Sequence, residues 1–235
     1  MKLNLPDVTL VVVDTKSHQL TRVAVDKCLK VANFGDIHIH TNQSEHFKDL
    51  NHKHEINRIP VFKDKYAVGI YLWAMVPSII QTSHFLFIQW DSWIINPAAW
   101  TPEFLNFDYI GAPWWYDDGY NVGNGGFSLR STRMTQFVAD NYCLYPHPFA
   151  RNEDDLLCRA YRGSLEHKGF KWAPAALAFR FAFERLIPEN KPFGFHGIFN
   201  WHRVLTPDEL SRHLGIAKDN EYIKQSGMLD ELQVA

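Results

Sequence analysis

The sequence is poor in cysteine and has no long apolar run. Its three cysteines, Cys28, Cys143 and Cys158, are odd in number and widely scattered, without a CxxC pair. Such a set predicts no disulfide framework and is typical of a reducing compartment. No apolar stretch approaches the roughly 20 residues that span a bilayer. We therefore expect a cytoplasmic protein with no transmembrane segment, for which peripheral association with the inner face of the membrane stays open.

The sequence also lacks an excess of positive charge and a leader-like start. Lys and Arg total 24 and Asp and Glu total 26, so no summed positive field is available to attract nucleic acid. Asp7 and Asp14 flank the short N-terminal apolar run, where a signal peptide would need a basic start and a small-residue cleavage site. These absences argue against nucleic acid as a partner and against a secretory leader.

Aromatic residues, in contrast, are plentiful, with 8 Trp, 9 Tyr and 17 Phe. Flat rings with a polar tip suit the faces of sugars as well as a protein core, and composition alone favours the core. A chain of 235 residues is long enough for one large α/β domain and too short for two generous ones. We expect a single domain over residues 1–235.

The N-terminal pattern predicts a βαβ unit. Residues 8–15, VTLVVVDT, are typical of a buried parallel strand; residues 20–35 predict a helix ended by Gly35, and residues 36–42 a short strand. Such units wind right-handed into a parallel sheet, and ligands of open sheets bind beyond the carboxyl ends of the strands. The polar residues expected at those ends are Asp14, Thr15, Thr41 and Asn42.

The remaining pattern alternates in the same way. Residues 43–65 predict loop or short helix. Further strands are expected at residues 85–89, 107–113 and 126–131. Helices are expected at residues 66–83, 97–107, 132–142 and 154–169, and in a C-terminal tail, residues 206–235, with Thr206 as N-cap. The pattern predicts an α/β fold.

Four stretches carry residues suited to chemistry. The first is the buried run 85–88, after which Asp91 would stand at the carboxyl edge of the sheet. A carboxylate there can coordinate a hard cation through oxygen, although it can equally cap a following helix or turn. The second is NVGNGG, residues 121–126, whose glycines permit positive φ and close approach of a ligand. The alternative for this stretch is a tight hairpin turn; it matches neither a P-loop nor GxGxxG.

The third stretch is RNEDD, residues 151–155, where acids open a predicted helix. Acids are favoured there by the helix dipole, yet Glu153 and Asp154 point about 100° apart at helical pitch. One can therefore cap the helix while the other faces a cleft with a raised pKa and accepts a proton from a hydroxyl. The fourth is PFGFHG, residues 192–197, in which His196 is either a core histidine or a metal ligand.

These stretches occur in an order that resembles the nucleotide-sugar-dependent glycosyltransferases of the GT-A fold. The chain most closely resembles an uncharacterised family of glycosyltransferase-like proteins found near polysaccharide and lipopolysaccharide genes. The likeness spans residues 85–197 and is carried by IQWDSWIINPAAW, FDYIGAPWW, VGNGGFSLRS, NEDDLLCR, FAFE and PFGFHG. A weaker similarity in layout connects the chain with the β-1,4-galactosyltransferases. The resemblance implies a Rossmann-like, mostly parallel central sheet flanked by helices.

The resemblance also implies site residues. Gln89, Trp90 and Asp91 fall on the family's Asp-x-Asp metal motif, with Gln89 in place of its first acid. Asp91 and His196 would hold Mn²⁺ or Mg²⁺ against the donor's diphosphate, and Gly125 and Gly126 would form the turn beside the donor sugar. The catalytic base would come from Glu153 or Asp154, and we favour Asp154. Asp14, Thr15 and Asn42 would contact the nucleotide. Trp114 and Trp115 would stack on an acceptor sugar, with core packing as the alternative.

The implied activity is inverting, metal-dependent transfer of a sugar, expected from a UDP-sugar, to a glycan acceptor in surface polysaccharide or lipopolysaccharide synthesis. Gln89 raises the alternative of a metal-independent transferase. Another alternative is an inactive protein of the same fold that binds nucleotide sugars or carbohydrate, since fold alone does not prove activity. A nucleotidyltransferase is disfavoured because VVVDTKSHQ is not a Gly-rich, Arg-containing phosphate loop.

Overall fold

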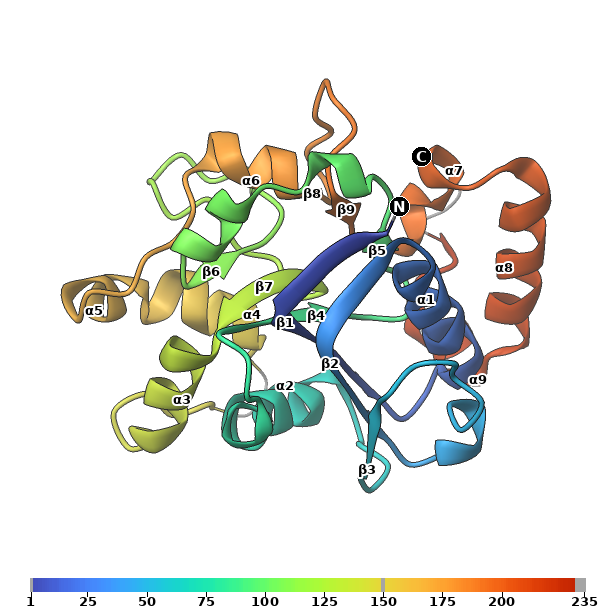
Figure 1. The fold of residues 1–235 in the computed structure, drawn as a ribbon, viewed down its shortest axis with the longest axis horizontal. Helices are drawn as coiled ribbons and strands as arrows, with labels where there is room; N and C mark the ends of the chain where they lie inside the picture. Colours follow the sequence, from blue (N-terminus) through green and yellow to red (C-terminus); the bar gives the residue numbers. More distant parts are fainter. Residues whose placement is uncertain (1, 149–150, 231–235) are drawn as a thin grey trace.

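A computed structural model describes residues 2–148 and 151–230. Its centre is a six-stranded sheet in the order β3-β2-β1-β4-β7-β6 (Figure 1). The strands are β1 (Leu3–Asp14), β2 (Ala32–Thr41), β3 (Glu55–Arg58), β4 (His84–Ile88), β6 (Tyr109–Ile110) and β7 (Phe127–Ser131). The first four run parallel to one another, and β7 pairs antiparallel with both β4 and β6. The expected α/β fold with a mostly parallel central sheet is confirmed.

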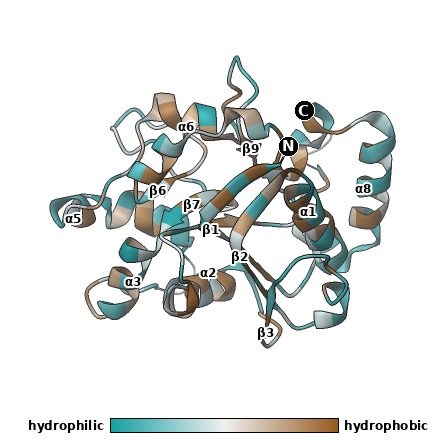
Figure 2. Ribbon diagram, viewed as in Figure 1, coloured by the Kyte–Doolittle hydropathy of each residue, from teal (hydrophilic) through white to brown (hydrophobic). Residues whose placement is uncertain are grey.

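Helices cover both faces of this sheet (Figure 1). They are α1 (His18–Val31), α2 (Lys65–Ala74), α3 (Thr132–Asp140), α4 (Glu153–Asp155), α5 (Arg162–His167), α6 (Ala175–Phe181), α7 (Trp201–Val204), α8 (Pro207–Asp219) and α9 (Glu221–Ser226). Along β1, Leu10 and Val12 pack with α1, whereas Val11 and Val13 pack on the other face with α2. Burial on both faces explains the unbroken β-branched run of β1, and Figure 2 shows apolar residues gathered along the central strands.

A second, three-stranded sheet lies beside the first. It consists of β5 (Trp93–Ile94), β9 (Gly194–Phe195) and β8 (Ala182–Phe183), in that order. Trp93 pairs with Phe195, and Phe195 pairs with Phe183. These pairings bring together the residues just before β5 and just after β8 and β9, which come from parts of the chain about a hundred residues apart.

Several expected elements are wrong. The helix expected over residues 97–107 is two 3₁₀ turns, Pro97–Ala99 and Pro102–Asn106. The first helix ends at Val31 and β2 begins at Ala32, so Gly35 lies within a strand and does not end the helix. A Cβ at Gly35 would lie 2.0 Å from the carbonyl oxygen of Pro6, which shows that this glycine permits the close approach of β1 and β2. The helix expected over residues 66–83 ends at Ala74, because Pro77 begins a separate 3₁₀ turn.

The edge strand β3 was not expected, since residues 43–65 were read as loop or short helix. The C-terminal tail is helical as expected. Thr206 caps α8 in a capping box with Glu209, and α9 follows. Residues 231–235 of the expected tail lie outside the described residues. Among the described residues, none of the helices has the length and apolar character needed to cross a membrane.

Candidate active site

Asp91 and His196, the two predicted metal ligands, lie close together in the structure. Asp91 lies two residues before β5 and His196 directly follows β9, so the small sheet brings them together. The His196 Nε2 atom lies 3.5 Å from Asp91 Oδ1 and 3.1 Å from Gln89 Oε1. Gln89 is itself fixed by its main chain, whose N–H donates to the carbonyl of Gly126 at 3.0 Å. Three potential metal-ligand atoms, Asp91 Oδ1, Gln89 Oε1 and His196 Nε2, thus lie together although they come from two distant segments of the chain.

The chemistry of this donor set fits a divalent cation. Asp91 is 6% exposed, and its Oδ1 atom is buried with no hydrogen-bond partner in the described part of the chain. Such an oxygen is costly to bury unless something satisfies it. A carboxylate oxygen, an amide oxygen and an imidazole nitrogen are together ligands that Mn²⁺ accepts. The alternative that Asp91 caps a helix finds no support, because the following 3₁₀ turn has Asn96 at its N-cap.

Glu184, to which the sequence analysis gave no role, orients the histidine. It directly follows β8, and its Oε1 atom lies 2.9 Å from His196 Nδ1. A carboxylate bound to one ring nitrogen fixes the orientation of the ring, as carboxylates behind the histidine ligands of metal sites do. Burial by itself lowers the pKa of His196, but the carboxylates of Asp91 and Glu184 outweigh it and raise that pKa well above its usual value, so a metal ion bound at Nε2 has to displace a proton. The signal available beforehand was FAFE, an acid at the end of an apolar run.

The glycine turn packs directly against this cluster. A Cβ on Gly126 would lie 2.1 Å from His196 Nε2, and one on Gly125 would lie 2.7 Å from Glu153 Oε1. Both glycines are therefore needed for close approach. The positive φ expected of the glycines belongs instead to Asn124, at 62°, whose Nδ2 lies 3.1 Å from His196 Nδ1. The turn thus joins the histidine on one side to the acids of α4 on the other.

Glu153 and Asp154, the two acids of α4 predicted for the site, have different surroundings. Glu153 forms an ion pair of 2.5 Å with Arg130, a β7 residue that is 1% exposed. Arg130 also donates from Nε to Ser128 Oγ at 2.9 Å. Asp154 accepts the N–H of Gly125 through Oδ2 at 2.8 Å. Glu153 is therefore paired with the buried guanidinium of Arg130. Asp154 instead accepts the backbone N–H groups of Gly125 and Asp155.

The environment of Asp154 makes its carboxyl group a weak acid. Burial first, and then the negative charge of Glu153, raise its pKa to about 7, against the opposing hydrogen bonds from the N–H groups of Gly125 and Asp155. The ordinary value is 3.8. A carboxylate with a pKa near neutrality is basic enough to accept a proton and still ionised in a useful fraction.

This raised pKa has a consequence for stability. Between pH 3.8 and about 7 the folded chain keeps a proton on Asp154 that the unfolded chain has lost, so stability falls as the pH rises through this window. We expect Asp154→Asn to be more stable than the wild type above pH 7, and the difference to vanish below pH 3.8. Urea unfolding of both proteins across this range measures it. Asp155→Asn is the control, and an unchanged difference at all pH values would contradict the expectation.

A cavity of about 290 Å³ opens beside the cluster at the carboxyl ends of β1 and β4. We call it the strand-end cavity; its lining includes the predicted residues Asp14, Thr15, Gln89, Trp90, Asp91 and His196. Asp14 also accepts the N–H of Ser17 at 2.9 Å, and Thr15 Oγ1 that of Phe62 at 3.1 Å. A larger adjoining cavity of about 720 Å³ shares Thr15, Lys16 and Tyr222 with it but lacks the acid and imidazole cluster.

Not every predicted residue reaches the strand-end cavity. Asn42 lines neither of these two cavities and instead lies 2.9 Å from His18 Nε2 through its Oδ1 atom. Trp114 packs against Gly123, where a Cβ would lie 2.1 Å from the ring, and joins the hydrophobic cluster behind it. Trp115 is 61% exposed. Of the two tryptophans, Trp115 has the ring open to solvent.

The cavity also has a wall that the sequence did not predict. Tyr222, on the C-terminal helix α9, lines both cavities, and Lys65 of α2 lines the strand-end cavity. Burial, followed by the negative charges of Asp91, Asp14 and Asp64, raises the pKa of Tyr222. No motif marks these residues, because they reach the cavity only through the packing of α2 and α9.

Comparison with protein-family models assigns the chain to a family. Residues 66–196, more than half of the chain, match the model of a family described as a protein of unknown function, DUF5672. A search of curated proteins gives no match. The matched segment contains the Asp91 loop, the glycine turn, the acids of α4 and His196.

Solved structures show what the fold is similar to. The galactosyltransferase LgtC, in complex with donor and acceptor sugar analogues, aligns with a TM-score of 0.54 and 12% identity over 91% of this chain and 96% of that one. A glycosyltransferase involved in glycosylation of the major capsid of PBCV-1 gives 0.50 and 12%, over 89% and 98%. The apo form of glycosyltransferase GlyE of Streptococcus pneumoniae TIGR4 gives 0.50 and 10%, over 88% of this chain and 55% of that one. The resemblance to the GT-A fold is confirmed.

Proposed function

Since the chain belongs to the DUF5672 family and has the GT-A fold, we propose that it transfers a sugar from a nucleoside-diphosphate sugar to a glycan acceptor. The observation that carries this proposal is the meeting of Asp91, Gln89 and His196 at the edge of the strand-end cavity, with Asp154 joined to the same cluster through the glycine turn. UDP-sugars are the proposed donors, and surface polysaccharide or lipopolysaccharide synthesis is the proposed setting.

Asp91 and His196, with the amide oxygen of Gln89, are the residues that would hold a divalent cation, Mn²⁺ or Mg²⁺. When bound, such a cation neutralises the charge that develops on a departing nucleoside diphosphate. Glu184 holds the His196 ring so that Nε2 faces Asp91. The metal-independent alternative derives from Gln89. A neutral amide oxygen can also be a metal ligand, and Gln89 Oε1 lies 3.1 Å from His196 Nε2, which itself lies 3.5 Å from Asp91 Oδ1.

Asp154 is the proposed base. The acceptor hydroxyl attacks the anomeric carbon, the bond from that carbon to the phosphate oxygen breaks with its electron pair, and the proton of the hydroxyl moves to Asp154. The N–H of Gly125 fixes Oδ2 of this carboxylate. Glu153 is the weaker candidate because its charge is paired with buried Arg130. Its negative charge serves to raise the pKa of Asp154.

We propose that the transfer inverts the anomeric carbon. In-line displacement needs the base and the leaving group on opposite faces of the transferred sugar. Asp91 and His196 line the strand-end cavity, whereas Glu153 and Asp154 do not.

The two cavities together offer room comparable to the roughly 300–1,000 Å³ typical of small-molecule sites. Trp115 remains the better placed of the two tryptophans for an acceptor sugar, because its ring is exposed.

A screen of nucleotide sugars by thermal unfolding, with Mn²⁺ and with EDTA, tests the proposal. A true donor binds the folded chain alone and raises the melting temperature by mass action, and Mn²⁺ is expected to increase that rise. A donor at a hundred times its Kd stabilises by about 2.7 kcal/mol. Stabilisation that EDTA leaves unchanged would favour the metal-independent transferase. Binding without any product across a broad acceptor panel would favour an inactive nucleotide-sugar-binding protein.

A further inference from the structure

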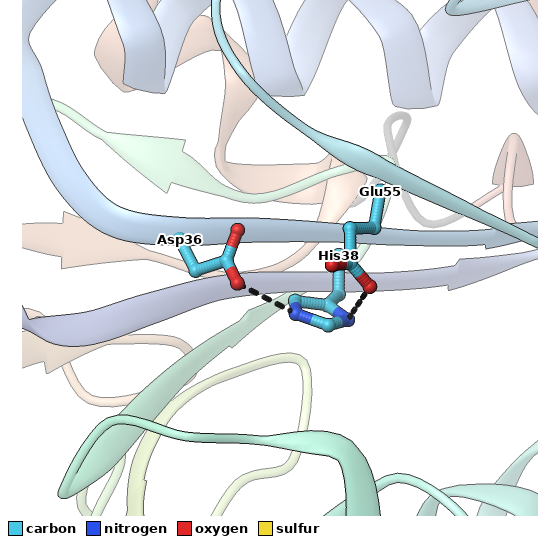
Figure 3. Close-up of side chains that lie close together, drawn as sticks. All are labelled: Asp36, His38 and Glu55. Carbon is cyan, nitrogen blue, oxygen red and sulfur yellow. Dashed lines mark hydrogen bonds and ion pairs between the residues drawn. The ribbon is translucent and has the colours of Figure 1, made fainter.

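A group of potential metal ligands lies at the edge of the main sheet, on β2 and β3 (Figure 3). It consists of Asp36, His38 and Glu55, whose ligand atoms all lie within 4.8 Å of one another. Asp36 and His38 are two residues apart on β2 and therefore share one face of the sheet. Glu55 of β3 pairs with His38 in the parallel register. None of the three lines the strand-end cavity or the adjoining one.

The imidazole of His38 is held at one nitrogen and unsatisfied at the other. His38 is 2% exposed, and its Nε2 atom lies 3.0 Å from Asp36 Oδ2, a good hydrogen bond to an acceptor-only group. The Nδ1 atom is buried and has no hydrogen-bond partner among the residues the structure describes. In a neutral ring, a proton on Nε2 that is donated to Asp36 leaves the lone pair on Nδ1. Figure 3 shows the ring lying between the two carboxylates, with Nδ1 directed at Glu55.

The gap between His38 Nδ1 and Glu55 has the width that a bridging cation needs. Nδ1 lies 3.8 Å from Glu55 Oε2, which is too long for a hydrogen bond. Zinc binds imidazole nitrogen at about 2.0–2.1 Å and carboxylate oxygen at about 2.0–2.2 Å, so an ion between the two atoms spans this distance with a bent angle. Asp36 on the far nitrogen completes the carboxylate–imidazole–metal arrangement of known zinc sites.

We propose that His38 Nδ1 and Glu55 bind a divalent transition metal of the zinc class, with Asp36 orienting the imidazole. Glu55 is 60% exposed at its side chain, so water can complete the coordination. Mixed imidazole and carboxylate ligands suit zinc better than Mg²⁺.

A metal ion at this position would stabilise the pairing of the edge strand β3 with β2. β3 has four residues and is the edge strand; within residues 2–148 and 151–230 it pairs with β2 alone. The chain after β3 continues toward the strand-end cavity: the N–H of Ile59 donates to Thr41 O and that of Phe62 to Thr15 Oγ1, both at 3.1 Å. Zinc would thus stabilise the segment that supports Thr15. The proposal that zinc binds here does not depend on whether the chain catalyses the proposed transfer reaction.

Calorimetric titration of the metal-free, full-length chain with ZnCl₂ alone tests this site. Glu55→Gln is the main variant, because an exposed side chain can be changed without disturbing the core, whereas His38 is buried. We expect Glu55→Gln to bind one zinc ion fewer per chain than the wild type and to gain less in melting temperature from zinc. Glu45→Gln, an exposed acid in the same connection, is the matched control and should bind as the wild type does.

Two further variants separate this site from the one at His196. Asp91→Asn is expected to keep the zinc ion that Glu55→Gln loses. Asp36→Asn is expected to keep the stoichiometry with about 10–100-fold weaker affinity, as for other changes to a residue that orients a ligand. Equal stoichiometry and affinity in Glu55→Gln and wild type would overturn the proposal. His38 would then be a histidine placed between two carboxylates without a metal.

Discussion

Turnover in the presence of Mn²⁺ is expected to fall by about a hundred- to a thousandfold when Asp91 is replaced by asparagine, the usual loss for one group that stabilises developing charge. Asparagine has the same shape, but its neutral amide attracts a divalent cation less strongly than the carboxylate does. The buried Oδ1 atom, 3.5 Å from His196 Nε2, is the position that changes. The measurement is steady-state sugar transfer over a series of Mn²⁺ concentrations, in which the variant should also need more metal.

Asp140→Asn, at the exposed end of α3, is the control for a loss of one negative charge and should transfer at the wild-type rate. Circular dichroism and the melting temperature establish that the fold of Asp91→Asn is intact. Wild-type turnover in Asp91→Asn would show that this carboxylate is not a ligand. Unchanged wild-type activity in EDTA would instead assign the reaction to the metal-independent class.

The second large effect is expected at the base. Asp154→Asn should lower kcat by about a hundred- to ten-thousandfold, the usual contribution of general base catalysis, with little change in the KM for the donor. An amide cannot accept the proton of the acceptor hydroxyl, yet its oxygen can still accept the N–H of Gly125 and so preserve the turn. In the wild type, kcat should rise with pH through about 7 and level off above it, because only the ionised carboxylate is active.

The adjacent acid offers a matched control for this variant. Asp155 lies one residue further along, where it pairs with Arg151, and Asp155→Asn should keep both the rate and its pH profile. The pH profile of Asp154→Asn should lose its rise near neutrality. A wild-type profile that is flat across this range, or an Asp154→Asn variant with unchanged kcat, would show that proton transfer to Asp154 is not part of the reaction.

Much of the fold follows from local patterns in the sequence. The β-branched run of β1 lies in the sheet as expected, and β4 and β7 occupy the predicted segments within one or two residues. Thr206 caps α8 because a hydroxyl three residues before Glu209 satisfies the first N–H groups of a helix. These signals are readable because each depends on residues within one turn or one strand.

The errors arose where a distant contact overrides the local signal. Gly35 follows a helical pattern, where glycine often ends a helix. In the structure it lies in β2, and β1 passes so close to it that no side chain fits. β3 carries polar residues and no alternating apolar pattern, since it is an edge strand of four residues. In both cases the neighbour that decides the structure lies far away in the sequence.

The sequence by itself determined the class of fold, the order of its main elements and the set of acids, glycines and histidine that lie around the site. Only the tertiary structure decided how they combine. The pairing of β5, β9 and β8 brings Asp91, Glu184 and His196 together, and strands of two residues are too short to carry a periodic signal. Likewise, Glu153 pairs with Arg130 whereas Asp154 accepts the N–H of the glycine turn, and burial raises the pKa of Asp154.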